Sequence, residues 1–197
     1  KKFIVEIGCN DGTALSFLRE KGIPHLGVEP SRNVAEIAKK KGINVINNFF
    51  SLELAQEIAS THGLATHIFA ANVICHIADL KDLAGGVHRL LREDGIFMFE
   101  EPYLVDMLKK GSYDQIYDEH VYLFSLTSVK NVFARHGLYL FDAEPQVTHG
   151  GSMRYILSKD KSVSSSARLR ELMREEDSFG VKEHLNYNEF VRKCYLG

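Results

Sequence analysis

The stretch Phe3-Ile-Val-Glu-Ile-Gly-Cys-Asn-Asp-Gly12 joins a short run of β-forming residues to a glycine-rich turn. A helical pattern follows at once over residues 13–21, with Leu15 and Leu18 on one side. Gly8 and Gly12 permit positive φ angles and a close approach of the backbone to a ligand. The stretch therefore predicts a strand, a ligand-accessible turn and a helix, in that order.

The same alternation continues through the first hundred residues. Strands are predicted over 25–28, 44–46, 67–71 and 95–100, and helices over 31–41, 52–62 and 79–92, with Ser31 as a cap. Strict alternation with short loops indicates parallel strands with helices on both faces. We therefore predict an α/β fold with a Rossmann-like, doubly wound, mostly parallel sheet.

The pattern changes after residue 101. Helices are predicted over 103–110 and 127–136, and an antiparallel strand pair over 138–147 and 153–157 closes one edge of the sheet. Two charged helical segments, 167–176 and 182–194, have too little apolar content to form a core alone. We predict a first domain over 1–160, and we interpret 161–197 as the helical start of a C-terminal domain.

Composition excludes several classes of function. The 24 basic and 26 acidic side chains give a net charge of -2, which lacks the strong basic field of a general nucleic-acid binder. No apolar run approaches the roughly 20 residues that span a bilayer, so no membrane partner is expected. The three separated cysteines favour a reducing cytoplasm over a disulfide framework. We expect a cytoplasmic monomer or weak homodimer.

The glycine turn and the acidic residue at the end of the second strand limit which ligands the site can bind. Glu29 ends the strand that follows the turn, where a carboxylate can accept both hydroxyls of a ribose. The spacing G-x-x-x-G differs from the G-x-G-x-x-G of dinucleotide sites, and no P-loop lysine follows. Glu6 and Asp11 beside the turn suit a cation better than a diphosphate. S-adenosylmethionine, a sulfonium compound without phosphate, fits these features.

At this point the sequence resembles a known class. Glu6-Ile-Gly-Cys-Asn-Asp-Gly12, Gly27-Val-Glu-Pro-Ser31 and Ala71-Asn-Val-Ile-Cys-His76 look like successive motifs of class I S-adenosylmethionine-dependent methyltransferases. The resemblance implies S-adenosylmethionine as cofactor and S-adenosylhomocysteine as product. By position, the residues that it assigns to the cofactor are Glu6, Gly8, Asn10, Gly12, Glu29, Pro30, Phe49, Asn72 and His76.

A segment rich in acids and aromatic rings then carries a second resemblance. Tyr117-Asp-Glu-His-Val-Tyr-Leu-Phe-Ser125 and His149-Gly-Gly-Ser-Met-Arg154 look like motifs of the sugar C-methyltransferases, which act on nucleotide-linked 4-keto deoxysugars at C3. In that family the histidine is the base, which corresponds to His120, and the neighbouring Tyr117 and Glu119 assist. A C3 proton next to a C4 ketone is acidic enough for a histidine base if the enolate is stabilised.

The resemblance also implies substrate contacts and neighbouring domains. Tyr103, His149 and Arg154 are expected to contact the nucleotide-sugar, and no metal site is expected in this chain. Members of the family carry a cysteine-rich zinc module before the methyltransferase domain and a substrate domain after it, so this chain is either part of a longer protein or a reduced relative with another substrate.

Three other readings stay open on the sequence alone. An O- or N-methyltransferase of another small metabolite would keep the cofactor turn without needing His120 to form a carbanion. A non-catalytic module would bind the cofactor without turnover, and a dinucleotide-dependent oxidoreductase would bind NAD instead.

Overall fold

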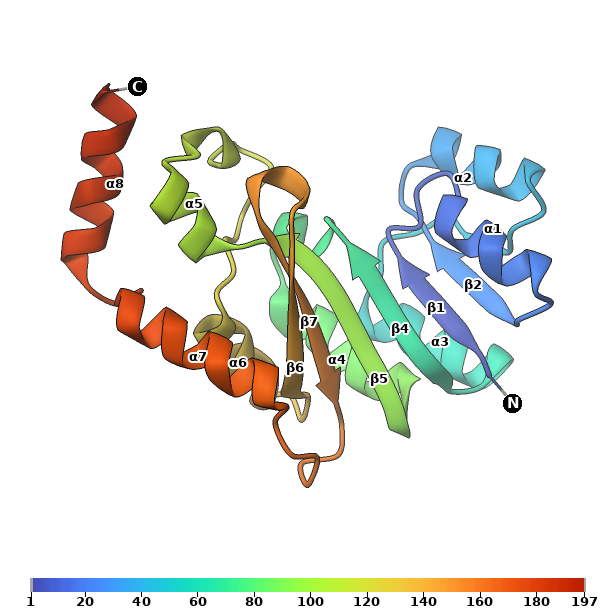
Figure 1. Cartoon of the computed structure of the whole chain (residues 1–197). Helices are drawn as coiled ribbons and strands as arrows, with labels where there is room; N and C mark the ends of the chain where they lie inside the picture. Colours follow the sequence, from blue (N-terminus) through green and yellow to red (C-terminus); the bar gives the residue numbers. More distant parts are fainter. Residues whose placement is uncertain (1, 197) are drawn as a thin grey trace.

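A seven-stranded sheet organises the computed structural model, which describes residues 2–196 (Figure 1). The strand order is β3-β2-β1-β4-β5-β7-β6. The strands are β1 (Ile4–Ile7), β2 (His25–Val28), β3 (Val45–Ile46), β4 (Ala65–Ala71), β5 (Leu91–Pro102), β6 (Tyr139–Gln146) and β7 (Ser152–Ser158). The first five strands are parallel, whereas β7 runs antiparallel to both β5 and β6. The predicted doubly wound sheet with an antiparallel edge is confirmed.

Helices cover the sheet and its margins. They are α1 (Thr13–Glu20), α2 (Arg32–Lys40), α3 (Leu52–His62), α4 (Leu80–Leu90), α5 (Leu104–Lys110), α6 (Leu126–Ala134), α7 (Ala167–Phe179) and α8 (His184–Leu196), with 3-10 turns η1 (Ile74–His76), η2 (Tyr113–Gln115) and η3 (Thr148–Gly150). In Figure 1, α1 lies on one face of the sheet, and α3 and α4 lie on the other. Among the described residues, no helix is long and apolar enough to cross a membrane.

The order of strands places a crevice beside β1. The chain moves outward from β1 to β2 and β3, then returns to pair β4 on the other side of β1. The loops after β1 and β4 therefore leave the sheet in opposite directions, which opens a crevice at the carboxyl ends of these strands.

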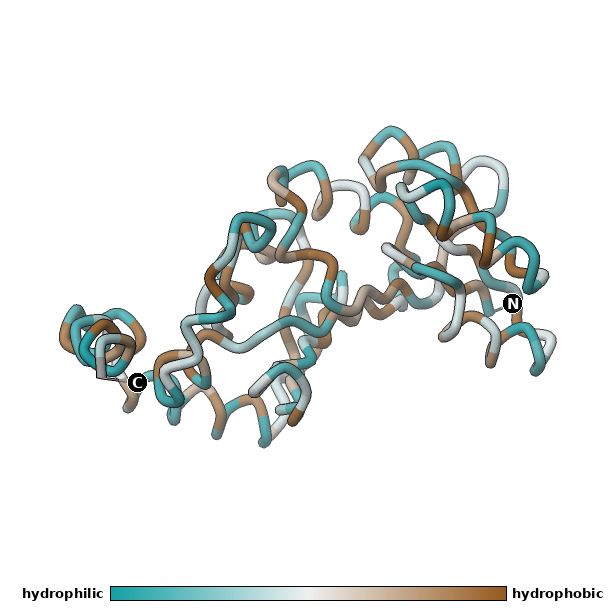
Figure 2. Tube along the Cα trace, turned by 90° about the horizontal axis from the view of Figure 1, so that it is seen from above, coloured by the Kyte–Doolittle hydropathy of each residue, from teal (hydrophilic) through white to brown (hydrophobic). Residues whose placement is uncertain are grey.

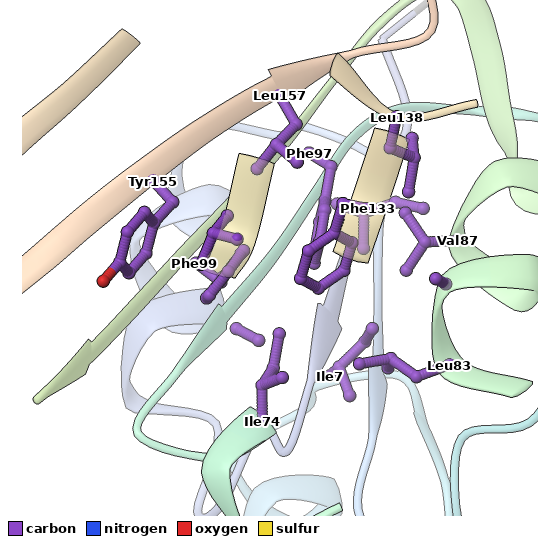
Figure 3. Close-up of a cluster of buried hydrophobic side chains, with 14 of the residues drawn as sticks. Ile7, Ile74, Leu83, Val87, Phe97, Phe99, Phe133, Leu138, Tyr155 and Leu157 are labelled. Atoms are coloured by element: carbon purple, nitrogen blue, oxygen red, sulfur yellow. The ribbon is translucent and has the colours of Figure 1, made fainter. Parts of the chain in front are cut away.

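Two apolar cores sandwich the parallel strands. The larger core contains Phe97, Phe99 and Phe133, and the rings of Phe99 and Phe133 lie 5.3 Å apart. Figure 3 shows these rings packed with Ile7, Ile74, Leu83 and Val87. A smaller core on the opposite face joins Leu15 of α1 to Ala38 of α2. Apolar contact on both faces is the condition under which parallel sheets are stable.

Local details differ from the sequence-based expectations at two places. The helix predicted over 79–92 ends at Leu90, because β5 already begins at Leu91 and extends to Pro102. Ser31 does precede α2, but its side chain forms no capping hydrogen bond. Its backbone N instead donates to Glu29 Oε1 at 2.8 Å.

The C-terminal helices make different contacts. Helix α7 contributes Leu169 to the larger core, and its buried Glu176 accepts hydrogen bonds from the N-terminal backbone amides of α6. Helix α8 packs on α5 through Phe190. Figures 1 and 2 both show α8 at the end of the molecule opposite the N-terminus. The packing of the sheet domain thus continues past residue 160, and a separate C-terminal domain stays a prediction.

Candidate active site

A cavity of about 530 Å³ lies at the carboxyl ends of the parallel strands. Its wall combines the turn after β1, the end of β2, the loop before α3 and the turn η1. The lining residues are Ile7, Gly8, Asn10, Val28, Glu29, Pro30, Phe49, Phe50, Ser51, Val73, His76, Ile77, Ala78, Asp79 and Asp82. This is the size and position of a small-molecule site in an open α/β sheet.

The turn after β1 depends on glycine. Gly8 has φ of 68°, and a Cβ there would lie 2.4 Å from Val73 Cγ2. Asn10 also adopts a positive φ of 50°. A larger residue at position 8 would thus combine backbone strain with a clash, and the turn can approach a ligand closely.

The carboxylate of Glu29 is held in place by backbone amides. Its Oε2 accepts from Asn10 N at 3.0 Å, and its Oε1 accepts from Ser31 N at 2.8 Å. A carboxylate has about four acceptor positions, so two remain for the hydroxyls of a ribose. The local fold thus orients Glu29 before any ligand binds.

The two acidic residues predicted beside the turn have different environments. Glu6 is 7% exposed, and its Oε2 is buried without a hydrogen-bond partner. Burial, together with the nearby Asp11 and Glu29 carboxylates, raises the pKa of Glu6 to about 8. Asp11 faces the surface, where hydrogen bonds from Lys41 and Thr13 lower its pKa to about 2. Asp11 is therefore paired within the protein and Glu6 is held mainly in its neutral form, so Glu29 is the acid of this group that lines the cavity.

Most of the residues predicted for the cofactor share this cavity. Its lining includes six of them: Gly8, Asn10, Glu29, Pro30, Phe49 and His76. The other three lie behind the lining. Glu6 is buried on β1, Gly12 packs against Ile43 and Ala38, and Asn72 adopts a positive φ of 54° after β4.

The predicted catalytic segment lies next to the cavity, on the far side of η1. The backbone amides of Val121 and Tyr122 donate to Cys75 O at 2.9 and 3.2 Å. His76, which lines the cavity, contacts Glu119 O through Nδ1 at 2.7 Å. A carbonyl only accepts, so the His76 proton is on Nδ1. The turn η1 thus joins the cofactor cavity to the segment that contains His120.

Tyr117 and His120 form a hydrogen-bonded pair. His120 Nδ1 lies 2.8 Å from Gln115 O, so Nδ1 is the donor and Nε2 is left as the acceptor. The Tyr117 hydroxyl lies 2.8 Å from that Nε2 and donates to it. The local backbone therefore selects the tautomer in which Nε2 can take a proton. Glu119, the third predicted member, is exposed, and its backbone rather than its carboxylate contacts His76.

Cys75, His76 and His120 bring potential metal-ligating atoms within 4.8 Å of one another. Burial and the neighbouring Glu101 carboxylate raise the pKa of the Cys75 thiol well above its ordinary value. His120 uses both ring nitrogens in hydrogen bonds, to Gln115 O and to the Tyr117 hydroxyl, and His76 Nδ1 is bonded to Glu119 O. The geometry is better suited to proton chemistry at His120.

The three residues predicted for the substrate lie outside the cofactor cavity. The Tyr103 hydroxyl is buried and donates to Glu176 Oε2 at 2.8 Å. Arg154 is paired with Glu100 and Glu144 at 3.0 and 3.2 Å. His149 is exposed in η3, with φ of 51°. The polar atoms of Tyr103 and Arg154 already hydrogen-bond internal carboxylates, and a substrate contact at either residue stays a prediction.

One buried acid in this region has no role in the sequence-based predictions. Glu101 is fully buried at the end of β5, and its Oε1 accepts from Val73 N at 2.9 Å and Ile74 N at 2.6 Å. The sequence contains a signal for it. Phe97, Phe99 and Glu101 alternate along a strand, so Glu101 shares the buried face of two core rings.

The cavity fits S-adenosylmethionine on its own geometry. Glu29 offers free acceptor positions to a ribose, and the exposed ring of Phe49 offers an apolar face to an adenine. Gly8 lets the backbone approach the ligand closely, because a Cβ at this position would already meet Val73. The ribose and the adenine of one nucleoside are thus matched by different residues of the same cavity.

Comparison with known proteins agrees with this geometry. Residues 1–142 match the methyltransferase domain family. The chain is 37% identical over 190 residues to C-methyltransferase NovU of Streptomyces niveus, covering 95% of this chain and 45% of that protein. It thus spans a little under half the length of this curated relative.

Solved structures show the same fold. A methyltransferase of Thermotoga maritima described as a possible histamine N-methyltransferase superposes with a TM-score of 0.61 and 19% identity, covering 81% of this chain and 83% of that one. A TehB-like methyltransferase of Corynebacterium glutamicum gives 0.60 and 20%, covering 81% and 80%. The chain therefore belongs to the methyltransferase domain family and has the fold and cofactor of the class I S-adenosylmethionine-dependent methyltransferases.

Proposed function

We propose that the protein methylates a carbon atom of a nucleotide-linked keto-deoxysugar and that His120 is the base. The observation that carries this proposal is the pair formed by Tyr117 and His120, in which Gln115 O fixes the proton on Nδ1. The similarity to a C-methyltransferase supports carbon as the methyl acceptor. Methyl transfer to oxygen or nitrogen needs no carbanion. It therefore does not require a base and a hydrogen-bond donor arranged as His120 and Tyr117 are.

The chain's residues divide the reaction between them. His120 Nε2 takes the proton from the carbon next to the ketone, and the electron pair of that C–H bond forms an enolate. The Tyr117 hydroxyl, released from Nε2, donates to the enolate oxygen that gains negative charge. When bound, S-adenosylmethionine supplies the methyl group, and S-adenosylhomocysteine leaves with the electrons of the broken carbon–sulfur bond. Glu29 and Gly8 would hold the donor, whose methyl group the enolate carbon attacks to form the new carbon–carbon bond.

The test separates proton removal from methyl transfer. A nucleoside-diphosphate-linked 4-keto deoxysugar is incubated in deuterium oxide with the protein and S-adenosylhomocysteine, and mass spectrometry follows deuterium entering at C3. We expect His120→Asn to slow exchange and methyl transfer by about 10²–10⁴-fold, with unchanged affinity for S-adenosylhomocysteine. His184→Asn, at the exposed start of α8, is the matched control.

Two results would contradict the proposal. Undiminished exchange by the His120→Asn protein would remove His120 from the role of base. Methylation of an oxygen or nitrogen of the substrate, located by NMR, would replace carbon as the acceptor.

A further inference from the structure

Glu101 anchors the turn η1 through hydrogen bonds from the backbone at the start of the turn. Its carboxylate is fully buried, and Oε1 accepts two hydrogen bonds from the consecutive amides of Val73 and Ile74. The side chain of Ile74 is also fully buried, among the core residues drawn in Figure 3. The turn is therefore held by hydrogen bonds to one acceptor atom and by the buried side chains of Ile74 and Cys75.

The turn held in this way touches both halves of the site. On the cofactor side, Val73 packs so closely on Gly8 that a Cβ there would lie 2.4 Å away. On the catalytic side, Cys75 O accepts from Val121 N and Tyr122 N, and His76 Nδ1 donates to Glu119 O. One short turn thus contacts the cofactor loop and the catalytic segment at once.

Apart from η1, the catalytic segment reaches the cavity wall through Tyr122, whose hydroxyl donates to Ala78 O at 2.7 Å. Among the described residues, the cavity lining includes Val73 and His76 but no residue of 117–122. The segment forms no helix or strand between η2 and α6 apart from a single bridge between Phe124 and Tyr103. A ligand in the cavity can therefore influence 117–122 through η1 and through Ala78, two residues after it.

We propose that Glu101 is a positioning residue that couples cofactor binding to the order of the catalytic segment. A ligand pressed against Gly8 and His76 restrains η1, and η1 restrains residues 119–122 through Cys75 O and the His76 imidazole. The importance of that segment rests on the proposed function, but the coupling itself does not require methyl transfer. The coupling depends on an acceptor oxygen at the position of Glu101 Oε1, because both restrained amides donate to that atom.

Hydrogen exchange with S-adenosylhomocysteine as the ligand tests the coupling. In the unmodified protein we expect the ligand to slow exchange of the Val121 and Tyr122 amides about tenfold, within the usual range of coupling between sites. Glu101→Met has no acceptor oxygen, so this slowing is lost while that of the cofactor turn, residues 8–12, persists. Glu101→Gln keeps an acceptor oxygen, so we expect the ligand to slow exchange both at residues 8–12 and at Val121 and Tyr122. The Gln variant would thus restore the coupling that the Met variant lacks.

Glu176→Met is the matched control. Glu176 is also buried and also accepts from two consecutive backbone amides, but at the start of α6. This variant should lose comparable stability and still show ligand-dependent slowing at Val121 and Tyr122. The comparison separates coupling from a general loss of stability.

Several outcomes would overturn the proposal. The absence of slowing at 121–122 in the unmodified protein, or unchanged slowing in Glu101→Met, would show that Glu101 does not couple the two parts. If the Met variant does not fold, His76→Phe breaks the contact with Glu119 O at the other end of η1, and unchanged slowing there has the same meaning. Failure of the proposed function would appear differently, as missing deuterium entry and methyl transfer with the coupling intact.

Discussion

The Glu29 carboxylate accepts a hydrogen bond from the backbone amide of Asn10 at 3.0 Å, which ties the end of β2 to the turn after β1. Because Ser31 N occupies the other oxygen, Glu29 is restrained from both sides. The carboxylate is thus positioned by the same turn that approaches the cofactor, so the two contacts to a nucleoside are prearranged together.

Replacement of this carboxylate should weaken the cofactor site. Glu29→Ala removes two charge-assisted hydrogen bonds to a ribose, and we expect the Kd of S-adenosylhomocysteine to rise about 10–100-fold. Calorimetric titration measures it, with Glu36→Gln as control, because Glu36 is an exposed partner of Lys39. Equal affinity in the Glu29→Ala protein would place the ribose elsewhere.

Alanine substitutions at two glycines distinguish the cost of backbone strain from the cost of a steric clash. Gly22 and Gly8 have φ of 64° and 68°, but a Cβ at Gly22 meets nothing within 4 Å. Gly22→Ala should therefore cost about 1–2 kcal/mol from strain alone. Gly8→Ala should cost a further 1–3 kcal/mol or so from the contact with Val73 and lose cofactor affinity.

Chemical denaturation gives both stability values. Addition of Val73→Ala to the Gly8→Ala protein should recover part of the stability, because it removes the crowded methyl groups. Equal costs for the two glycine substitutions would mean that the Val73 contact relaxes freely.

The raised pKa of Glu6 makes stability depend on pH. Between its ordinary value of 4.5 and about 8, the folded protein keeps the Glu6 proton and the unfolded chain loses it. The free energy of unfolding therefore falls as pH rises through this window. Glu6→Gln does not titrate, so its loss of stability between pH 5 and 8 should be smaller by at least about 1 kcal/mol, roughly 2–4 °C in Tm.

Thermal unfolding of the ligand-free protein from pH 4 to 9 measures this difference. Glu57→Gln, an exposed substitution on α3, controls for the change in net charge. Parallel pH curves for the Glu6→Gln and unmodified proteins would show that Glu6 titrates normally in the folded state.

The buried pair formed by Tyr103 and Glu176 should be strongly coupled. Glu176→Ala leaves the Tyr103 hydroxyl and the amides of Leu126 and Thr127 without their acceptor, and we expect a loss of about 3–5 kcal/mol. Tyr103→Phe removes one donor only and should cost about 1 kcal/mol. A double-mutant cycle by urea denaturation gives their interaction energy, and strict additivity would contradict the hydrogen bond.

The cofactor wall was predictable because its signals are local. Gly8 and Glu29 each follow a strand directly, Asn10 lies three residues after β1, and parallel strands bring their carboxyl ends to one edge. No knowledge of distant partners was needed for them. The tautomer of His120 is also local, since Gln115 lies five residues away, but the turn that places that carbonyl has no distinct sequence pattern.

The predictions for Tyr103 and Arg154 depended on partners far away in the sequence. Glu176 lies 73 residues after Tyr103, and Glu100 lies 54 residues before Arg154. Such pairings follow from strand register and helix docking, which composition and periodicity do not specify. The alternation of residues along the strand predicts that Glu101 lies on the buried face. The sequence does not predict which backbone amides donate to its carboxylate.

The carboxylate that α7 delivers to the start of α6 also limits how this protein can be recombined. A chimera joined near residue 160 would take α6 from one parent protein and Glu176, which accepts hydrogen bonds from the first turn of α6, from the other. A junction after Gly180, where α7 ends in a left-handed glycine, keeps the pair together. Segments after Gly180 that are exchanged at that point should be inherited without disturbing the sheet.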